Sequence, residues 1–79
     1  MKTIDIYTAR VENYDTLHMN RDLNKLMQEV CEIHQLDDEP YEDHLLRDGD
    51  EVYGGWLQML DEDGLTVKVE IYYNDCVEI

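Results

Sequence analysis

Apolar and polar residues recur at regular spacings along most of this chain, and these spacings predict its first elements. Residues 3–11 largely alternate apolar with polar side chains, which is typical of a β-strand, and the polar stretch 12–15 predicts a turn. From Leu23 onward, apolar residues recur every three or four positions, which predicts an amphipathic helix capped by Asn20 or Asp15. The apolar stripe of this helix consists of Leu23, Leu26, Met27, Val30 and Ile33.

The segment after this helix contains a proline. Leu36 ends the helical pattern, and Pro40 suits the first turn of a new helix but not the interior of the old one. Residues 41–46, "YEDHLL", are therefore predicted as a short second helix. Acids in its first turn would be stabilised by the positive end of the helix dipole. Residues 47–51 then predict a turn.

Two strands are predicted in the C-terminal part, at residues 52–60 and 65–73. They are joined by residues 61–64, "DEDG", whose Asp-Gly pair is typical of a tight hairpin. In the second strand, Leu65 and every alternate residue to its end are expected to face the core. Gly54-Gly55 indicates either a bulge in the first strand or a tighter hairpin turn within it.

Together these elements predict an α+β fold: one main amphipathic helix packed on a small, mostly antiparallel sheet. The expected order is strand, helix, short helix, strand, strand. An extra strand at residues 74–79 is an open alternative, in which Val77 and Ile79 return to the sheet. With 79 residues, the chain is expected to form a single domain over 1–79.

The net charge of the chain is far more negative than folding or solubility requires. Twenty Asp and Glu stand against six Lys and Arg, giving a net charge of −14, whereas a small soluble domain needs a magnitude of only about 2 to 8. Such self-repulsion destabilises the compact state, so something other than folding favours the acids. Phosphate contacts require clustered Lys and Arg, and none exist, so direct binding to nucleic acid or an anionic membrane is not expected. The expected partner is a basic protein surface.

The N-terminal residues and the hydropathy of the chain predict the cellular location of the protein and the redox state of its cysteines. Residues 1–11 lack the continuous apolar region of a signal peptide, and no run approaches the roughly 18 apolar residues of a membrane span. The protein is therefore expected in the cytoplasm, where Cys31 and Cys76 would stay reduced. A disulfide between them is the less favoured alternative.

Metal sites are not expected. The acidic stretches "DGDE" and "DEDG" resemble fragments of calcium loops, but starting at Asp48 puts Val52 at the fifth position and Met59 at the twelfth, where oxygen ligands are required. Cys31 and His34 are spaced like zinc ligands, with His44 and Cys76 as distant partners, but only one short-spaced pair exists. The simpler interpretation of Cys31 is a small buried residue.

Catalysis has no recognisable signature either. The chain has no Ser, so a serine hydrolase is excluded, and a reactive cysteine would need a cationic neighbourhood that this chain lacks. Gly54-Gly55 is not followed by the Lys or helix of a phosphate-binding loop. The protein is expected to be neither an enzyme nor a cofactor-binding protein.

What remains is a dense acidic block around the proline. Its predicted partner-binding residues are Asp37, Asp38, Glu39, Tyr41, Glu42, Asp43, Asp48, Asp50 and Glu51. Further acids that accompany it are Glu29, Glu32, Asp61, Glu62 and Asp63. Tyr41 is predicted as an aromatic anchor within the block, whereas Trp56, on a strand, is expected in the core. The plainer alternative is a solvated loop that keeps the protein soluble.

In length, acidity and lack of enzyme motifs, with "DDEPYED" and "DGDE" as its acidic stretches, the chain resembles the small anti-CRISPR and anti-restriction proteins of phages and mobile elements that mimic DNA. The resemblance implies a non-enzymatic inhibitor that occupies the DNA-binding surface of a Cas effector or another defence nuclease complex. Two other classes stay open: an acidic adaptor or antitoxin-like module without DNA mimicry, and a phage protein that forms homo-oligomers. The active form is expected to be a monomer or a small homo-oligomer.

Overall fold

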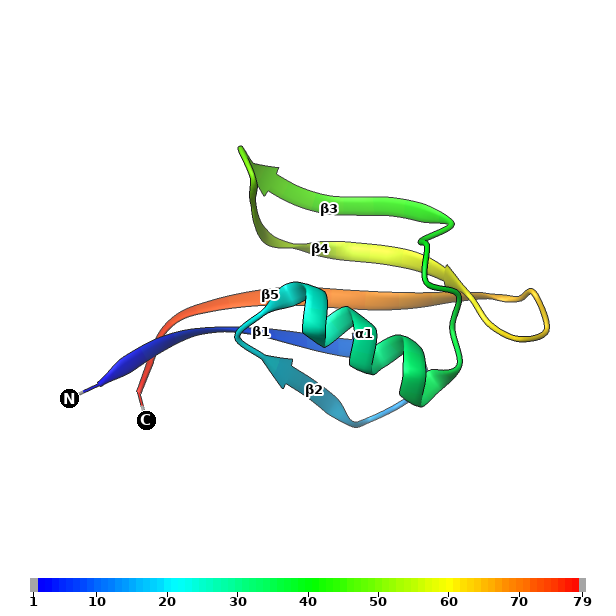
Figure 1. Cartoon of the computed structure of the whole chain (residues 1–79), viewed down its shortest axis with the longest axis horizontal. Helices are drawn as coiled ribbons and strands as arrows, with labels where there is room; N and C mark the ends of the chain where they lie inside the picture. The colour runs from blue at the N-terminus through cyan, green and yellow to red at the C-terminus, as the bar shows by residue number, and fades with distance from the viewer. Residues whose placement is uncertain (1, 79) are drawn as a thin grey trace.

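Strands form most of the structure. The computed structural model describes residues 2–78, which form one helix and a five-stranded antiparallel sheet in the order β2-β1-β5-β4-β3. The elements are β1 (Thr3–Val11), β2 (Leu17–Asn20), α1 (Leu23–His34), β3 (Glu42–Asp48), β4 (Glu51–Leu60) and β5 (Thr66–Glu78). α1 packs against β1 and β2, and β3 and β4 lie beyond it (Figure 1). The predicted α+β class is confirmed, although strands dominate it.

α1 begins at Leu23 because Asp22 caps it. The Asp22 carboxylate accepts hydrogen bonds from the backbone N–H groups of Asn24, at 2.9 Å, and Lys25, at 3.2 Å. This satisfies donors that have no partner inside the helix. The prediction of Asn20 or Asp15 as the cap was wrong by at least two residues, because residues 17–20 form β2 instead.

α1 ends at His34 because the next residue, Gln35, adopts a left-handed conformation with φ 54°. The Gln35 N–H donates to the carbonyl of Cys31, and this closes the helix. Leu26 and Val30 are buried against the sheet as the stripe predicts, but Ile33 is 57% exposed. Ile33 therefore points away from the core, although it follows the apolar spacing.

β2 is the element that sequence analysis missed. Its four residues pair antiparallel with β1, from Leu17 opposite Arg10 to Asn20 opposite Tyr7. His18 on β2 is buried, and its Nε2 lies 3.0 Å from Nε2 of His34. Burial and then the neighbouring His18 lower the pKa of His34, which favours the neutral form of this ring where β2 meets the end of α1.

β3 replaces the predicted short helix. Residues 42–48 pair antiparallel with β4, from Glu42 opposite Gln58 to Asp48 opposite Glu51. The prediction of a helix at 41–46 was wrong because local dipole and proline signals were outweighed by the free edge of β4, whose backbone groups need partners. Within β3, Leu45 packs against the core on the helix side of the sheet, and Leu46 points to the opposite side and is 52% exposed.

The paired glycines lie inside β4, next to a bulge. Leu46 of β3 lies opposite Gly54, but Arg47 lies opposite Val52, so Tyr53 is an extra residue in β4. The bulge alternative is therefore the correct one, and no hairpin turn divides this strand. The bulge bends β4 toward the turn that joins it to β3.

β5 is longer than predicted and runs to Glu78. Its end returns to the sheet as expected, with Val77 opposite Ile4 of β1, but it continues β5 and is not a separate strand. Ile79 lies outside the described residues. The expected inward side of β5 is confirmed from Val67 to Tyr73, whereas Leu65 is 64% exposed because it belongs to the turn before the strand.

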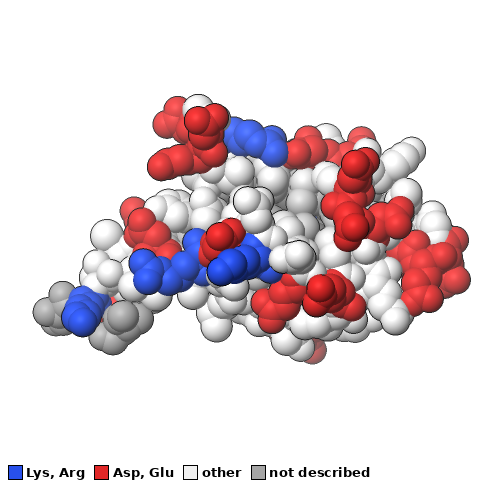
Figure 2. All heavy atoms as spheres, in the orientation of Figure 1, with Lys and Arg blue, Asp and Glu red and all other residues white. Residues whose placement is uncertain are grey.

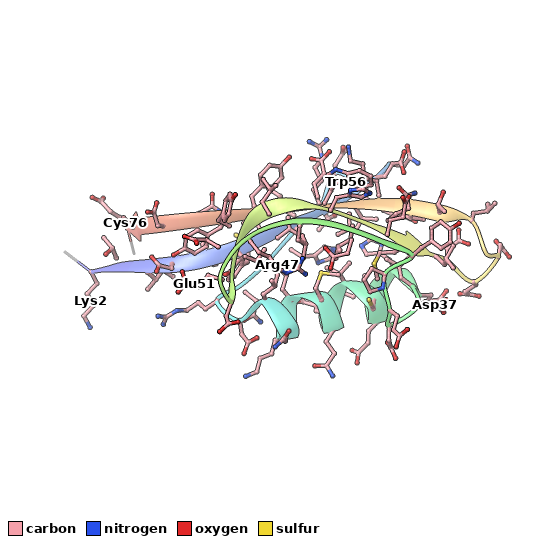
Figure 3. All side chains as sticks on the ribbon, turned by 90° about the horizontal axis from the view of Figure 1, so that it is seen from above. Lys2, Asp37, Arg47, Glu51, Trp56 and Cys76 are labelled. Atoms are coloured by element: carbon pink, nitrogen blue, oxygen red, sulfur yellow. The ribbon has the colours of Figure 1, made fainter. Side chains whose placement is uncertain are left out.

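The two faces of the sheet differ. The helix face carries the core, whose buried sheet residues are Ala9, Val11, Leu57, Met59, Val69 and Ile71. The opposite face, which we call the open face, has no helix over it among residues 2–78 (Figure 3). Antiparallel sheets commonly bury one face and leave the other in water. No helix among these residues is long and apolar enough to cross a membrane.

Candidate functional site

The acidic block of the sequence is divided in the structure. Residues 37–39 precede β3, whereas Asp48, Asp50 and Glu51 lie in and on either side of the turn that joins β3 to β4. At about 3.3 Å per residue, β3 separates the two halves by roughly 20 Å. Asp37 and Glu51 lie well apart along the molecule (Figure 3). The nine predicted residues therefore do not form one cluster.

Two backbone hydrogen bonds hold the first half of the block against β4. The Asp37 N–H donates to the carbonyl of Leu60 at 2.9 Å, and the Tyr41 N–H donates to the carbonyl of Gln58 at 2.7 Å. Because β4 ends at Leu60, these bonds place the segment beside the β4–β5 turn. We call the combined set of carboxylates the acidic end: Asp37, Asp38, Glu39, Asp61, Glu62 and Asp63.

The β4–β5 turn is fixed by Asp61. Its carboxylate accepts hydrogen bonds from the N–H groups of Asp63 and Leu65, both at 2.9 Å. Its own N–H donates to the Leu65 carbonyl at 2.9 Å, and Gly64 supplies the positive φ of 77° that the turn requires. Asp61 thus shapes the turn, while Glu62 and Asp63 are exposed on a fixed backbone.

The acidic end has no compensating ion pair. Among residues 2–78, the three ion pairs join side chains of β3 or of β5 and involve none of the six carboxylates. Burial raises the pKa of the Cys31 thiol, and the charges of Asp38 and then Asp37 raise it further, as a locally negative field requires. The C-terminus of α1 precedes this segment and adds its own partial negative charge.

Acidic and basic side chains occupy different parts of the face that carries α1 (Figure 2). Acids gather at the right of the view, over the β4–β5 turn and the connector between α1 and β3 (residues 35–41), and again over the β3–β4 turn at the upper left. Basic side chains lie mainly on the left half of this view. On this face, the acids at the right therefore lie farthest from the basic side chains.

The acids on β3 itself are partly neutralised. The Asp43 carboxylate accepts two hydrogen bonds from the Arg47 guanidinium, at 2.7 and 3.2 Å, and one from the Leu45 N–H at 3.0 Å. The bond with Arg47 is the main reason that the pKa of Asp43 is lowered. Glu42 lies 3.6 Å from His44. Charges on this edge strand also discourage pairing with another chain, so Glu42 and Asp43 have a structural role.

The two predicted aromatic positions differ from each other. Tyr41 is 62% exposed beside the acidic end, so it is accessible to a partner. The expectation that Trp56 is in the core was wrong, because Trp56 lies on the open face, on the opposite side of the sheet from α1 (Figure 3). It stacks on His44 with ring centres 4.1 Å apart, and Lys68 Nζ lies 5.1 Å from its ring centre.

The residues considered for zinc are separated in the fold. Cys31 is buried in α1, His34 faces His18, His44 stacks on Trp56 across the sheet, and Cys76 is exposed near the end of β5. Both cysteines are free thiols. Within residues 2–78, no three His, Cys, Asp or Glu side chains are arranged to hold a metal ion.

No protein-family model, curated protein or solved structure matches this chain. Its function is therefore argued from the surface alone. Sequence reasoning treated the β4–β5 turn as an accompaniment to the block, although this turn supplies half of the acidic end. The only sequence signal for this arrangement was Pro40, which interrupts the helix and requires a connecting segment there. That this segment returns to the β4–β5 hairpin is visible only in the structure.

Proposed function

We propose that this protein is a non-enzymatic cytoplasmic inhibitor that acts as a DNA mimic. It binds the basic DNA-binding surface of a bacterial defence nuclease, such as a CRISPR surveillance complex, through the acidic end. The observation that carries the proposal is the meeting of carboxylates from two separate segments, with no ion pair among residues 2–78 to neutralise them. A basic cleft offers these side chains the counter-charges that the protein itself does not supply.

The overall charge density supports this proposal. The protein carries a net charge of −14 and has a long axis of 46 Å. A DNA duplex of that length carries roughly 27 negative charges, at one per about 1.7 Å, so the protein reaches about half the duplex density. This density is sufficient for electrostatic steering toward a groove that normally receives DNA.

Rigidity supports it as well. The connector is hydrogen-bonded to β4 at Asp37 and Tyr41, and the turn is closed by Asp61. Side chains on a fixed backbone lose less entropy on docking than those of a flexible acidic tail. The acids of this protein are therefore arranged before binding.

A second candidate function is an acidic adaptor or antitoxin-like module that binds a protein without imitating DNA. Its support is the open face, which carries the half-buried Trp56 and, on several strands, exposed apolar side chains. The exposed members are Leu17, Met19, Leu46 and Tyr72, which are between 48% and 59% exposed. In that case apolar contacts would dominate binding.

Salt distinguishes the two candidates. Between about 0.05 and 0.5 M NaCl, screening should raise the thermal midpoint of the protein by about 5 °C, because self-repulsion falls. Over the same range, retention of the partner on the immobilised protein should fall at least tenfold if the acidic end provides the binding. The two slopes are read from a melting series and a wash series in the same buffers. Partner retention that is unchanged by salt would favour the adaptor and count against DNA mimicry.

A further inference from the structure

α1 covers only part of the helix face of the sheet. Five strands spaced about 4.8 Å apart span roughly 19 Å, whereas one helix is about 10 Å wide. α1 packs on β1 and β2, and the helix-face residues Leu57 and Met59 of β4 are also buried in the core, so β3 and the first part of β4 are left without a helix on this face. Figure 1 shows these two strands beyond α1. The uncovered strip lies along β3 and the first part of β4.

Side chains turn this strip into a groove between α1 and β3, with a volume of about 420 Å³. Its apolar lining comes from Leu23 and Met27 on α1, Leu45 on β3, and Val52 and Leu57 on β4. Leu23, Met27 and Leu45 are only partly buried, so they present apolar surface to whatever enters. The volume lies within the range of about 300 to 1,000 Å³ that is usual for ligand sites.

The rim of the groove is acidic. Asp22, Asp38, Asp43 and Asp50 line it, and its one cation, Arg47, is already bound to Asp43 at 2.7 Å. Asp22 caps α1, so Asp38 and Asp50 are the two rim carboxylates that neither pair with Arg47 nor cap the helix. This combination complements a ligand with an apolar stripe between Lys or Arg side chains.

We propose that the α1–β3 groove binds a basic amphipathic helix of a partner protein, which lies beside α1 and completes the helical layer. Such a helix inserts apolar residues at spacings of three and four into the groove, and its flanking cations meet the acidic rim. A second copy of this chain does not fit, because the solvent side of α1 carries Glu29 and Glu32 and would be repelled by the rim. The inference is independent of DNA mimicry, because the groove and the acidic end share only Asp38.

The test uses a synthetic 14-residue peptide of Leu and Lys whose leucines form one helical stripe. An isomer of equal composition, with leucines spread around the helix, controls for attraction to net charge alone. By calorimetry in about 0.15 M salt, the striped peptide should bind at least tenfold more tightly than the isomer, because only its apolar stripe fills the groove. Equal affinities for the two peptides would overturn the proposal.

Neighbouring leucines on β3 provide a matched pair of variants. Leu45→Lys places a cation in the groove and should weaken binding of the striped peptide at least tenfold. Leu46→Lys makes the same change on the open face, where the side chain is 52% exposed, and should alter affinity by less than twofold. Asp50→Lys changes only the exposed rim, so it should weaken binding severalfold even if Leu45→Lys unfolds.

These variants leave Glu62 and Asp63 intact, so they separate the groove from the acidic end. Loss of peptide binding in Leu45→Lys, with capture of the DNA-binding partner retained, supports the groove as a separate site. Equal weakening by Leu45→Lys and Leu46→Lys would contradict it. A dimer that forms through the groove, detected by sedimentation and abolished by Leu45→Lys, would assign the groove to a second copy and would also overturn the proposal.

Discussion

Replacing Gly55 with alanine should lower the free energy of unfolding by about 3 kcal/mol or more. A Cβ at this position would lie 2.5 Å from the His44 carbonyl oxygen, 2.7 Å from Leu45 Cα and 2.9 Å from Leu46 N. All three atoms belong to the backbone of β3, which cannot move aside as a side chain would. The φ of 111° adds conformational strain for any residue with a Cβ. Chemical denaturation of the two proteins measures this loss.

Gly64→Ala is the matched control. Gly64 also has a positive φ, 77°, but nothing lies within 4 Å of its Cβ position. This variant should lose only about 1 to 2 kcal/mol, the usual cost of a left-handed conformation. If Gly55→Ala proved no less stable than Gly64→Ala, β3 would not approach β4 as closely as described, and the groove beside β3 would lose its basis.

Reversing three exposed acids at the acidic end, Asp38→Lys with Glu62→Lys and Asp63→Lys, should weaken partner binding about 100-fold. Each reversal removes an attraction and adds a repulsion, worth about 1 kcal/mol after screening, and about 3 kcal/mol corresponds to a factor of this size. Asp61 is left unchanged because its carboxylate closes the turn. Affinity of each variant for the captured partner, measured at one salt concentration, provides the comparison.

The control makes the same change in net charge away from the acidic end. Asp48→Lys, Glu51→Lys and Asp75→Lys together alter exposed residues that form no ion pair among residues 2–78. Their combined effect should stay below about tenfold, because only long-range attraction changes. A loss as large as that of the first triple variant would show that net charge, and not the acidic end, determines binding.

Local patterns predicted the parts of the fold that local forces decide. The stripe of α1 and the alternation of β5 are both set by burial of one side, and both were found. β2 and β3 were not predicted because their existence depends on pairing across the chain: β2 with Tyr7 to Arg10 of β1, and β3 with the free edge of β4. Pairing energy of this kind outweighed the helical signals of "YEDHLL" and the capping signal of Asn20.

Sequence alone located only one of the two segments of the acidic end. Asp37, Asp38 and Glu39 belong to the acidic end, but the assumption that neighbours in sequence stay together failed at β3, an extended strand that carries Asp48, Asp50 and Glu51 away. The joining of the connector to the β4–β5 turn depends on the Asp37 to Leu60 hydrogen bond, which no local pattern reveals. Trp56 was misplaced because β-strand periodicity alone does not say which face is covered.

The most direct measurement is a competition between this protein and a short DNA duplex for the captured partner. We expect mutual exclusion: added duplex releases the partner from the protein, and no complex contains all three components, because both ligands need the same cationic surface. A stable ternary complex, in which DNA and this protein bind the partner together without weakening each other, would contradict DNA mimicry.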